Sequence, residues 1–238
     1  MVASVSSLAL GLAVGLGAVP ALAASQLKID SREGILDAAR VLAGEAMAHY
    51  KGDERGGIPG ILPPIRAGGQ ENYYWWSGSW LMSNLIDYAQ LTGDDQYTIR
   101  VREGVLHQAG ENADYQPRNW TAQMGNDDQC SWASTALRAA ELGFLNPPDG
   151  QPGWLELAER VFAIQAHPSR HDDQCGGGLR WQIAPTNAGY EFKNSGFDPC
   201  VFLSFLRPCP AAGPATVTVG ISAWRRLRER WFGSSLVR

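Results

Sequence analysis

The sequence predicts an all-α fold of stacked helical hairpins, and three observations support this prediction. Apolar residues recur at helical spacing in several segments between residues 33 and 165. Short turns containing Gly or Pro alternate with longer polar loops between those segments. No convincing run of alternating strand residues occurs along the chain. The repeating order of helix, short turn, helix and long polar loop is typical of helical hairpins packed side by side.

In chain order, the helices are expected at residues 33–50, 80–91, 95–108, 127–142 and 154–165. The first carries an apolar stripe at Ile35, Ala39, Leu42 and Ala46, and the third is expected to bury Tyr97, Val101 and Val105. Gly93, Gly143 and Pro168 are expected to end the second, fourth and fifth helices. The glycine-rich segment 52–69 is expected to be a loop, and segment 176–182 a loop or a short strand.

Composition and the N-terminus limit the classes of protein that fit. The 238 residues suit one large domain or two small ones, and a net charge of −4 gives no electrostatic case for binding nucleic acid. Residues 1–23 are predicted to be a secretory signal, because Leu8 to Val19 is apolar and Ala21-Leu22-Ala23 has the form of a cleavage site. No charge precedes Lys28, which departs from that pattern. The alternative is a cytosolic protein with an apolar N-terminus.

A sequon and the cysteines agree with secretion. Asn119-Trp120-Thr121 is an acceptor for N-glycosylation. The four cysteines, at 130, 175, 200 and 209, are an even number and none has the spacing of a metal site. We choose Cys130–Cys175 as the bridge, although connectivity cannot be deduced from sequence. No cofactor and no metal ion is expected.

Two adjacent acids, Asp127 and Asp128, lie between Gly125-Asn126 and a predicted helix. Paired carboxylates among aromatic residues are what cleavage of a glycosidic bond requires: one protonates the leaving oxygen and the other meets the charge at the anomeric carbon. The bland alternative is a helix start, where acids are favoured by the helix dipole. Asn126 or Asp127 would then serve as the N-cap. Composition and spacing leave both interpretations open.

Other clusters compete with this pair. The tetrapeptide Asp-Asp-Gln-Cys recurs at 172–175, and motif counting cannot separate the two pairs. His167 and His171 next to that repeat suggest a metal site, but Pro168 breaks the helix that would align them, so a solvated loop with a bridged cysteine is favoured. Four successive aromatics, at 73–76, cannot all face the core of one helix. A second polar and aromatic cluster contains Trp181, Tyr190, Lys193 and Asn194, in which Lys193 would bind a hydroxyl, pair with an acid or stay exposed.

Several motifs occur together in one order. They are Tyr74-Trp75-Trp76-Ser77-Gly78, Gln90-Leu91-Thr92-Gly93-Asp94, Gly125-Asn126-Asp127-Asp128-Gln129, Cys175-Gly176-Gly177-Gly178-Leu179-Arg180-Trp181-Gln182, and Tyr190 with Lys193-Asn194-Ser195. On these motifs the chain resembles glycoside hydrolase family 76, in the fungal secreted branch of endo-1,6-α-mannanases. The resemblance covers about residues 26–195.

The resemblance implies an (α/α)6 toroid and a retaining glycosidase acting on α-1,6-mannan or on mannose-containing cell-wall glycans. It places the nucleophile on Asp127 and the acid/base on Asp128, and leaves the 172–173 pair without a catalytic role. The residues expected to bind substrate are Trp76, Asn126, Gln129, Trp181, Tyr190 and Lys193. It further implies a secreted monomer at the cell wall or cell surface, with peripheral association with membrane or wall and no nucleic-acid partner.

The expected organisation is a signal peptide at 1–23, the N-terminal part of the catalytic domain at 24–195 and an unrelated basic tail at 196–238. The tail has six Arg, no Lys and two acids. A frameshift, a retained intron or a faulty gene model near residue 196 would explain it. The toroid is then incomplete, and we expect such a chain to fold poorly or to be inactive. The alternatives to a hydrolase are a transglycosidase that joins anchor-glycan mannose to wall glucan, and an inactive glycan-binding fragment.

Overall fold

The computed structural model describes residues 29–193 except 64, 68–69, 73 and 174–177. Within this part the chain is helical, with helices α1 (Arg32–His49), α2 (Trp75–Thr92), α3 (Thr98–Gln108), α4 (Arg118–Thr121), α5 (Asn126–Leu142) and α6 (Trp154–Ala166) and a 3-10 turn at Pro168–Arg170. Two short strands, β1 (Ile65–Ala67) and β2 (Gln70–Asn72), pair antiparallel, with Ile65 opposite Asn72. The all-α prediction is confirmed, although the hairpin and α4 were expected to be loop.

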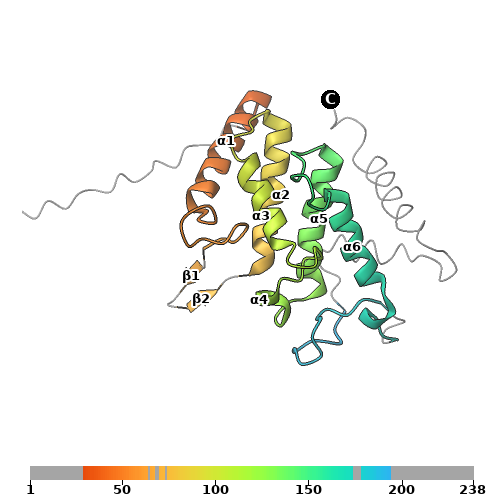
Figure 1. Ribbon diagram of the computed structural model, residues 1–238. Helices are drawn as coiled ribbons and strands as arrows, with labels where there is room; N and C mark the ends of the chain where they lie inside the picture. Colours follow the sequence, from red (N-terminus) through yellow and green to blue (C-terminus); the bar gives the residue numbers. More distant parts are fainter. Residues whose placement is uncertain (1–28, 64, 68–69, 73, 174–177, 194–238) are drawn as a thin grey trace, which may run out of the picture.

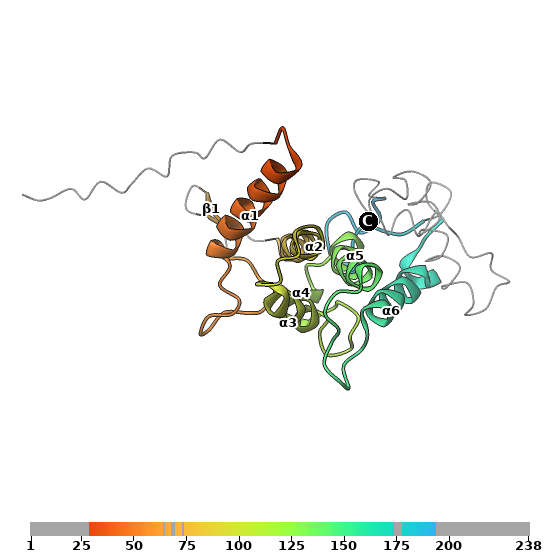
Figure 2. The same ribbon diagram turned by 90° about the horizontal axis from the view of Figure 1, so that it is seen from above.

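Helices α2 and α5 pack against each other, and α1, α3 and α6 pack against this pair. Seen from above, α2 and α5 lie side by side, with α3 next to α2 and α6 next to α5 (Figure 2). Helix α1 packs against α2. Helices α2 and α5 both begin at the end of the molecule where α4 and the segment after α6 also lie (Figure 1). This arrangement is part of an (α/α)6 toroid, in which the starts of neighbouring inner helices meet at one end.

The core is centred on aromatic and aliphatic side chains from α2, α3 and α5. Trp132 of α5 is fully buried; its ring centroid lies 5.5 Å from that of Trp75 and 6.1 Å from that of Tyr115. Val101 and Val105 of α3 are buried as expected, whereas Tyr97, which precedes the helix, is only partly buried. Burying a side chain of this size contributes roughly 1.5–3 kcal/mol, so this layer supplies much of the folding free energy.

Two predictions about helix ends and one about a helix face can be checked. Gly93 and Gly143 end α2 and α5 in the left-handed region, with φ of 72° and 60°, as expected. The stripe predicted for the first helix is wrong for Ile35 and Leu42, which are 52% and 56% exposed, whereas Ala39 and Ala46 are partly buried. The buried residues of α1 are instead Ala38, Ala43 and Met47.

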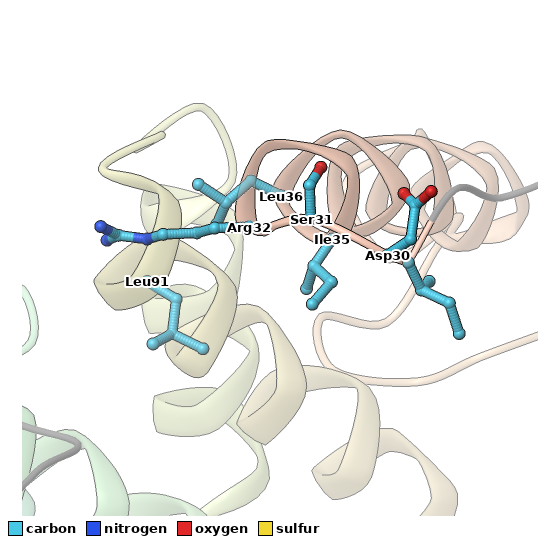
Figure 3. A pocket seen from close by; sticks show the side chains of 7 residues that line it. Asp30, Ser31, Arg32, Ile35, Leu36 and Leu91 are labelled. Carbon is cyan, nitrogen blue, oxygen red and sulfur yellow. The ribbon is translucent and has the colours of Figure 1, made fainter.

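A shallow cavity of about 410 Å³ lies at the far end of the helices from the start of α5. Figure 3 shows Leu91 from the end of α2 and Arg32 and Ile35 from the start of α1 around it. None of its lining residues is a predicted site residue. Among the described residues, no helix combines the length and the hydrophobicity that crossing a bilayer requires.

Candidate active site

The two acids lie in the first turn of α5, as predicted. The residue that precedes the helix is Gly125, so the expectation that Asn126 or Asp127 caps it is wrong. Asp128 supplies the capping bond: its Oδ2 accepts a hydrogen bond from the Gly125 backbone N–H at 2.6 Å. One of the two acids therefore holds the helix start. The helix-capping interpretation and the catalytic interpretation apply to the same residue, Asp128.

Asp127 is oriented by two donors. Its Oδ1 accepts a hydrogen bond from the backbone N–H of Asp128 at 3.0 Å, and its Oδ2 accepts one from the indole Nε1–H of Trp181 at 2.9 Å. Both partners are N–H donors, so each carboxyl oxygen of Asp127 acts as a hydrogen-bond acceptor. These two contacts fix the orientation of the Asp127 carboxyl group.

Gly125 shows how close the two carboxylates are. A Cβ atom built on Gly125 would lie 2.2 Å from Oδ1 of Asp127 and 3.2 Å from Oδ2 of Asp128. Since both oxygens are this close to one point, they are no farther apart than the sum of the two distances. One oxygen of each carboxyl therefore lies beside the Gly125 backbone, at the start of α5.

The environment of Asp128 differs from that of a surface acid. Burial raises the pKa of Asp128 from its usual 3.8 to about 6, the hydrogen bond from Gly125 opposes the rise, and the charge of Asp127 adds to it. A carboxyl with this pKa is protonated at mildly acidic pH and can give its proton to a leaving oxygen. The pair therefore combines a group that donates a proton with a neighbour held as a carboxylate.

The segment after α6 completes the site by docking on the start of α5. The backbone N–H of Asn126 donates to the Trp181 carbonyl at 2.7 Å, and its side-chain Nδ2 donates to the Arg180 carbonyl at 2.8 Å. Gly125 and Gln182 form an isolated antiparallel bridge. The prediction of a loop or short strand at 176–182 is confirmed for its described part, residues 178–182. These bonds bring the indole of Trp181 onto Asp127.

Buried amides support the floor of the site. Gln129 Nε2 donates to the Asp114 carbonyl at 2.7 Å, and Gln165 Nε2 donates to the Asn126 carbonyl at 2.7 Å. The Arg170 guanidinium donates to Asn126 Oδ1 at 2.7 Å, and burial lowers the pKa of this arginine. Asn126 and Gln129, predicted to bind substrate, are buried and engaged within the protein. Their observed contacts are those of residues that position the acids.

The loop before α4 passes under the same floor. Ala113 and Tyr115 both have φ of 54°, a left-handed conformation that costs energy for residues with a side chain. Tyr115 is fully buried and stacks on Trp132 at an interplanar angle of 17°. Arg170 also donates to Oε1 of Gln116 at 2.9 Å, which ties this loop to the segment after α6. The two strained residues thus flank Asp114, whose carbonyl accepts the hydrogen bond from Gln129 of α5.

The remaining predicted binding residues lie around the pair in different settings. Trp76 is partly buried at the start of α2, and its ring contacts are with Tyr74 and Trp80. The rings of Trp181 and Phe192 are stacked, with centroids 6.4 Å apart and planes 6° from parallel. Tyr190 lies under the Arg180 guanidinium, 4.9 Å from its ring centroid. The structure brings Trp181 into contact with the acids and gives no such contact for Trp76 or Tyr190.

The second acidic pair has a different environment. Asp172 forms ion pairs with Arg180 and Lys193, while Asp173 is exposed. Of the alternatives for Lys193, pairing with an acid is the one observed. His171 contacts the Gln165 carbonyl through Nε2, and His167 contacts the Ser169 hydroxyl through Nδ1. No group of three metal-binding side chains occurs in the part of the chain that the structure describes.

Two further predictions concern secretion. Asn119 is exposed in α4, where an attached glycan would extend into solvent. Cys130 is buried in α5 and disulfide-bonded. Cys175, its predicted partner, lies outside the described residues, so the pairing stays a prediction.

Two close carboxylates at a helix start, one of them with a raised pKa, are an arrangement that paired-acid glycoside hydrolases use. Comparison with known proteins agrees with this class. The chain belongs to glycosyl hydrolase family 76, whose model matches residues 34–207. The expected resemblance is confirmed. The match ends at residue 207, whereas the domain boundary was expected at residue 195.

The relatives include mannan endo-1,6-alpha-mannosidase DCW1 of Saccharomyces cerevisiae, 38% identical over 173 residues, which are 72% of this chain and 36% of that protein. A putative mannan endo-1,6-alpha-mannosidase of Schizosaccharomyces pombe is 41% identical over 66% of this chain and 34% of its own length. The crystal structure of Dfg5 from Chaetomium thermophilum in complex with glucosamine matches with a TM-score of 0.72 and 47% identity. That match covers 86% of this chain and 50% of the Dfg5 chain. The chain thus spans between about a third and a half of the length of these relatives.

Proposed function

We propose that this chain acts as a mannan endo-1,6-α-mannosidase, hydrolysing α-1,6-mannosidic bonds in cell-wall mannan with retention of configuration. The observation that carries the proposal is the convergence of the Asp127 and Asp128 carboxylates on one point beside Gly125. The names of the relatives support the substrate class. The sugar in the Dfg5 complex supports binding of a glycan by that relative's fold.

The proposed reaction has two steps. Protonated Asp128 gives its proton to the glycosidic oxygen while Asp127 attacks the anomeric carbon, so that the C–O bond breaks and a mannosyl ester forms on Asp127. The departing sugar leaves as an alcohol. Ionised Asp128 then takes a proton from water as the water oxygen attacks the anomeric carbon, which breaks the ester and restores both carboxyls. Two inversions give net retention.

Within this mechanism Trp181 holds Asp127 in line. Its indole Nε1–H binds Oδ2, which leaves Oδ1 on the side of the Gly125 backbone. The raised pKa of Asp128 keeps a proton available for the first step near pH 5–6. The Phe192 side chain, which is 66% exposed, offers an apolar surface on which a sugar ring can stack.

The test is digestion of linear α-1,6-mannan by the purified chain, with proton NMR recording the anomer first released. We expect the α-anomer, and loss of turnover in Asp127→Asn and Asp128→Asn. If the Asp172→Asn, Asp173→Asn double variant lost turnover while Asp127→Asn and Asp128→Asn retained it, the assignment of catalysis to Asp127 and Asp128 would be wrong. If the unaltered chain binds mannan without turnover, the glycan-binding alternative holds. New mannosyl products formed with added glucan acceptors would identify a transglycosidase.

We further propose that the protein is a secreted, glycosylated monomer associated with the cell wall or cell surface. The apolar residues 8–19, the exposed Asn119 and the disulfide at Cys130 support this. Expression in a secreting fungal host should give a glycoprotein whose mass falls on deglycosylation. The Asn119→Gln variant should show no such fall, and retention of the product in the cytosol would contradict the proposal.

A further inference from the structure

The acid at position 172, which the proposed mechanism does not use, lies in an unusual ionic cluster. Its Oδ2 accepts from Arg180 Nε at 3.1 Å, and its Oδ1 accepts from Lys193 Nζ. The three side chains are only 13%, 17% and 21% exposed. The ion pair of Arg160 with Glu156 on α6, by contrast, has side chains 46% and 49% exposed. Because both cations are also largely out of solvent, removing the shared carboxylate costs more than breaking an ordinary surface pair.

The two cations mark the two ends of one loop. Arg180 directly precedes Trp181, and Lys193 directly follows Phe192. The Trp181 backbone N–H donates to the Phe192 carbonyl at 2.7 Å, so the ends of segment 181–192 meet. One carboxylate, Asp172, thus binds the side chains on both sides of this closure. The Lys193 ammonium also donates to the Gly178 carbonyl at 3.1 Å, which fixes the strand that leads into the loop.

Inside the closed loop, the Trp181 ring is confined on several sides. Phe192 stacks on it, and a Cβ atom at Gly189 would lie 2.6 Å from the indole ring, so the Gly189 backbone packs directly against it. Arg180 is held between Asp172 and the ring of Tyr190. Its carbonyl accepts from Asn126, the residue before Asp127. A displacement of Arg180 would therefore move Trp181 relative to Asp127.

We propose that Asp172 is a positioning residue that closes the 181–192 loop and so holds the Trp181 indole N–H against Oδ2 of Asp127. Its importance for turnover rests on the proposed function, whereas its control of Trp181 does not. The first acid of the repeated Asp-Asp motif thus acts on the catalytic pair from a distance. Loss of its charge leaves the Arg180 and Lys193 cations facing one another, which opens the loop.

The test compares two adjacent variants with the same change in charge. Asp172→Asn removes the shared carboxylate, and Asp173→Asn is the matched control because Asp173 is exposed. The readout is hydrogen exchange of the Trp181 indole N–H by ¹⁵N NMR, with its signal assigned from Trp181→Phe. We expect exchange at least about 10-fold faster in Asp172→Asn and changed by less than about 2-fold in Asp173→Asn. Equal rates in the two variants would overturn the proposal.

Two further variants keep the test decisive if Asp172→Asn does not fold. Lys193→Met leaves the Asp172–Arg180 pair intact and should still speed indole exchange, because one end of the loop is released. Asp172→Glu keeps the charge and should restore slow exchange. Unaltered exchange in Lys193→Met would count against the closure.

Activity provides a separate readout. On α-1,6-mannan, kcat should fall on the order of 10- to 100-fold in Asp172→Asn with KM nearly unchanged, because a misplaced nucleophile slows chemistry rather than binding. Faster exchange with kcat equal to that of Asp173→Asn would refute the catalytic part. If the unaltered chain has no turnover, the proposed function fails while the exchange result still decides the role of Asp172.

Discussion

Replacing Gly125 by Ala is the sharpest test of the paired-acid site. The backbone of Gly125, with φ −88° and ψ 166°, is one that alanine adopts without strain. The new methyl would nevertheless lie 2.2 Å from Oδ1 of Asp127. A carbon and an oxygen in contact are about 3.2 Å apart, so the carboxylate must withdraw by roughly 1 Å. A misplacement of this size costs on the order of 10²-fold in rate, equivalent to about 2.7 kcal/mol.

The matched control is Gly153→Ala. Gly153 also precedes a helix, α6, with φ −68° and ψ 158°, but a Cβ there meets nothing within 4 Å. Both substitutions replace glycine at an N-cap by the poorer alanine, costing up to about 1 kcal/mol and 2–4 °C in Tm for a chain of this size. The assays are kcat on α-1,6-mannan and the indole signal of Trp181, which should shift only in Gly125→Ala. Activity within about threefold of the unaltered chain, or an equal loss in Gly153→Ala, would refute the reasoning.

Three other outcomes are expected. Because burial raises the folded-state pKa of Asp128 to about 6 from 3.8, its contribution to stability is present below pH 3.8 and is lost as the pH rises through 6. Asp128→Asn should therefore be more stable than the unaltered chain at pH 7 by up to about 2–3 kcal/mol, and urea unfolding should show no such advantage at pH 3.5. If Asp128 donates the proton, kcat/KM should fall above about pH 6, and a profile flat to pH 8 would exclude it as the acid. Trp181→Phe keeps an aromatic ring for the stack with Phe192 but removes the hydrogen-bond donor to Asp127. This substitution should lower kcat by roughly 10- to 100-fold with Tm nearly unchanged. Full activity would show that the indole hydrogen bond is dispensable.

The sequence was sufficient for the helices because their signals are local. Apolar periodicity and the terminal glycines located α3, α5 and α6 to within a few residues, since each helix is specified by neighbours three and four positions apart. The start of α2 was placed too late. Trp75 opens that helix because its ring is buried and its Nε1–H donates to Gln108, a contact across 33 residues. No local pattern contains this partner.

The packing face of α1 was also missed for a tertiary reason. Periodicity predicts that one stripe is buried, but the choice between Ile35 with Leu42 and Ala38 with Met47 depends on the surface of α2. Helix α1 turns its small residues inward, and the larger aliphatic side chains stay partly exposed. Average hydrophobicity therefore selected the wrong stripe.

For the site, the sequence supplied the two acids and could not supply their surroundings. Gly125 belongs to the motif, yet only the structure shows that its missing side chain makes room for both carboxylates. Arg170 and Gln165 carried no signal of a role, because each acts through a partner far away in the chain. Asp172 stood out only as a member of a rival acidic pair, and its pairing with Arg180 and Lys193 was not predicted. The repeated Asp-Asp motif was ambiguous in sequence and becomes distinct in space. Asp127 and Asp128 lie side by side at the start of α5, whereas Asp172 binds two cations and Asp173 is exposed.

The docking of Trp181 on Asp127 has a consequence for biosynthesis. The two residues are separated by 54 positions, so a ribosome makes the nucleophile well before the side chain that orients it. At about 5–20 residues per second, the interval is roughly 3–11 s. During that time α5 can pack against α2, which is already made. The Trp181 indole that orients Asp127 has not yet been synthesised. Maturation of the site is therefore expected to lag behind formation of the helical core, and a nascent chain arrested before residue 181 should be folded but catalytically incompetent.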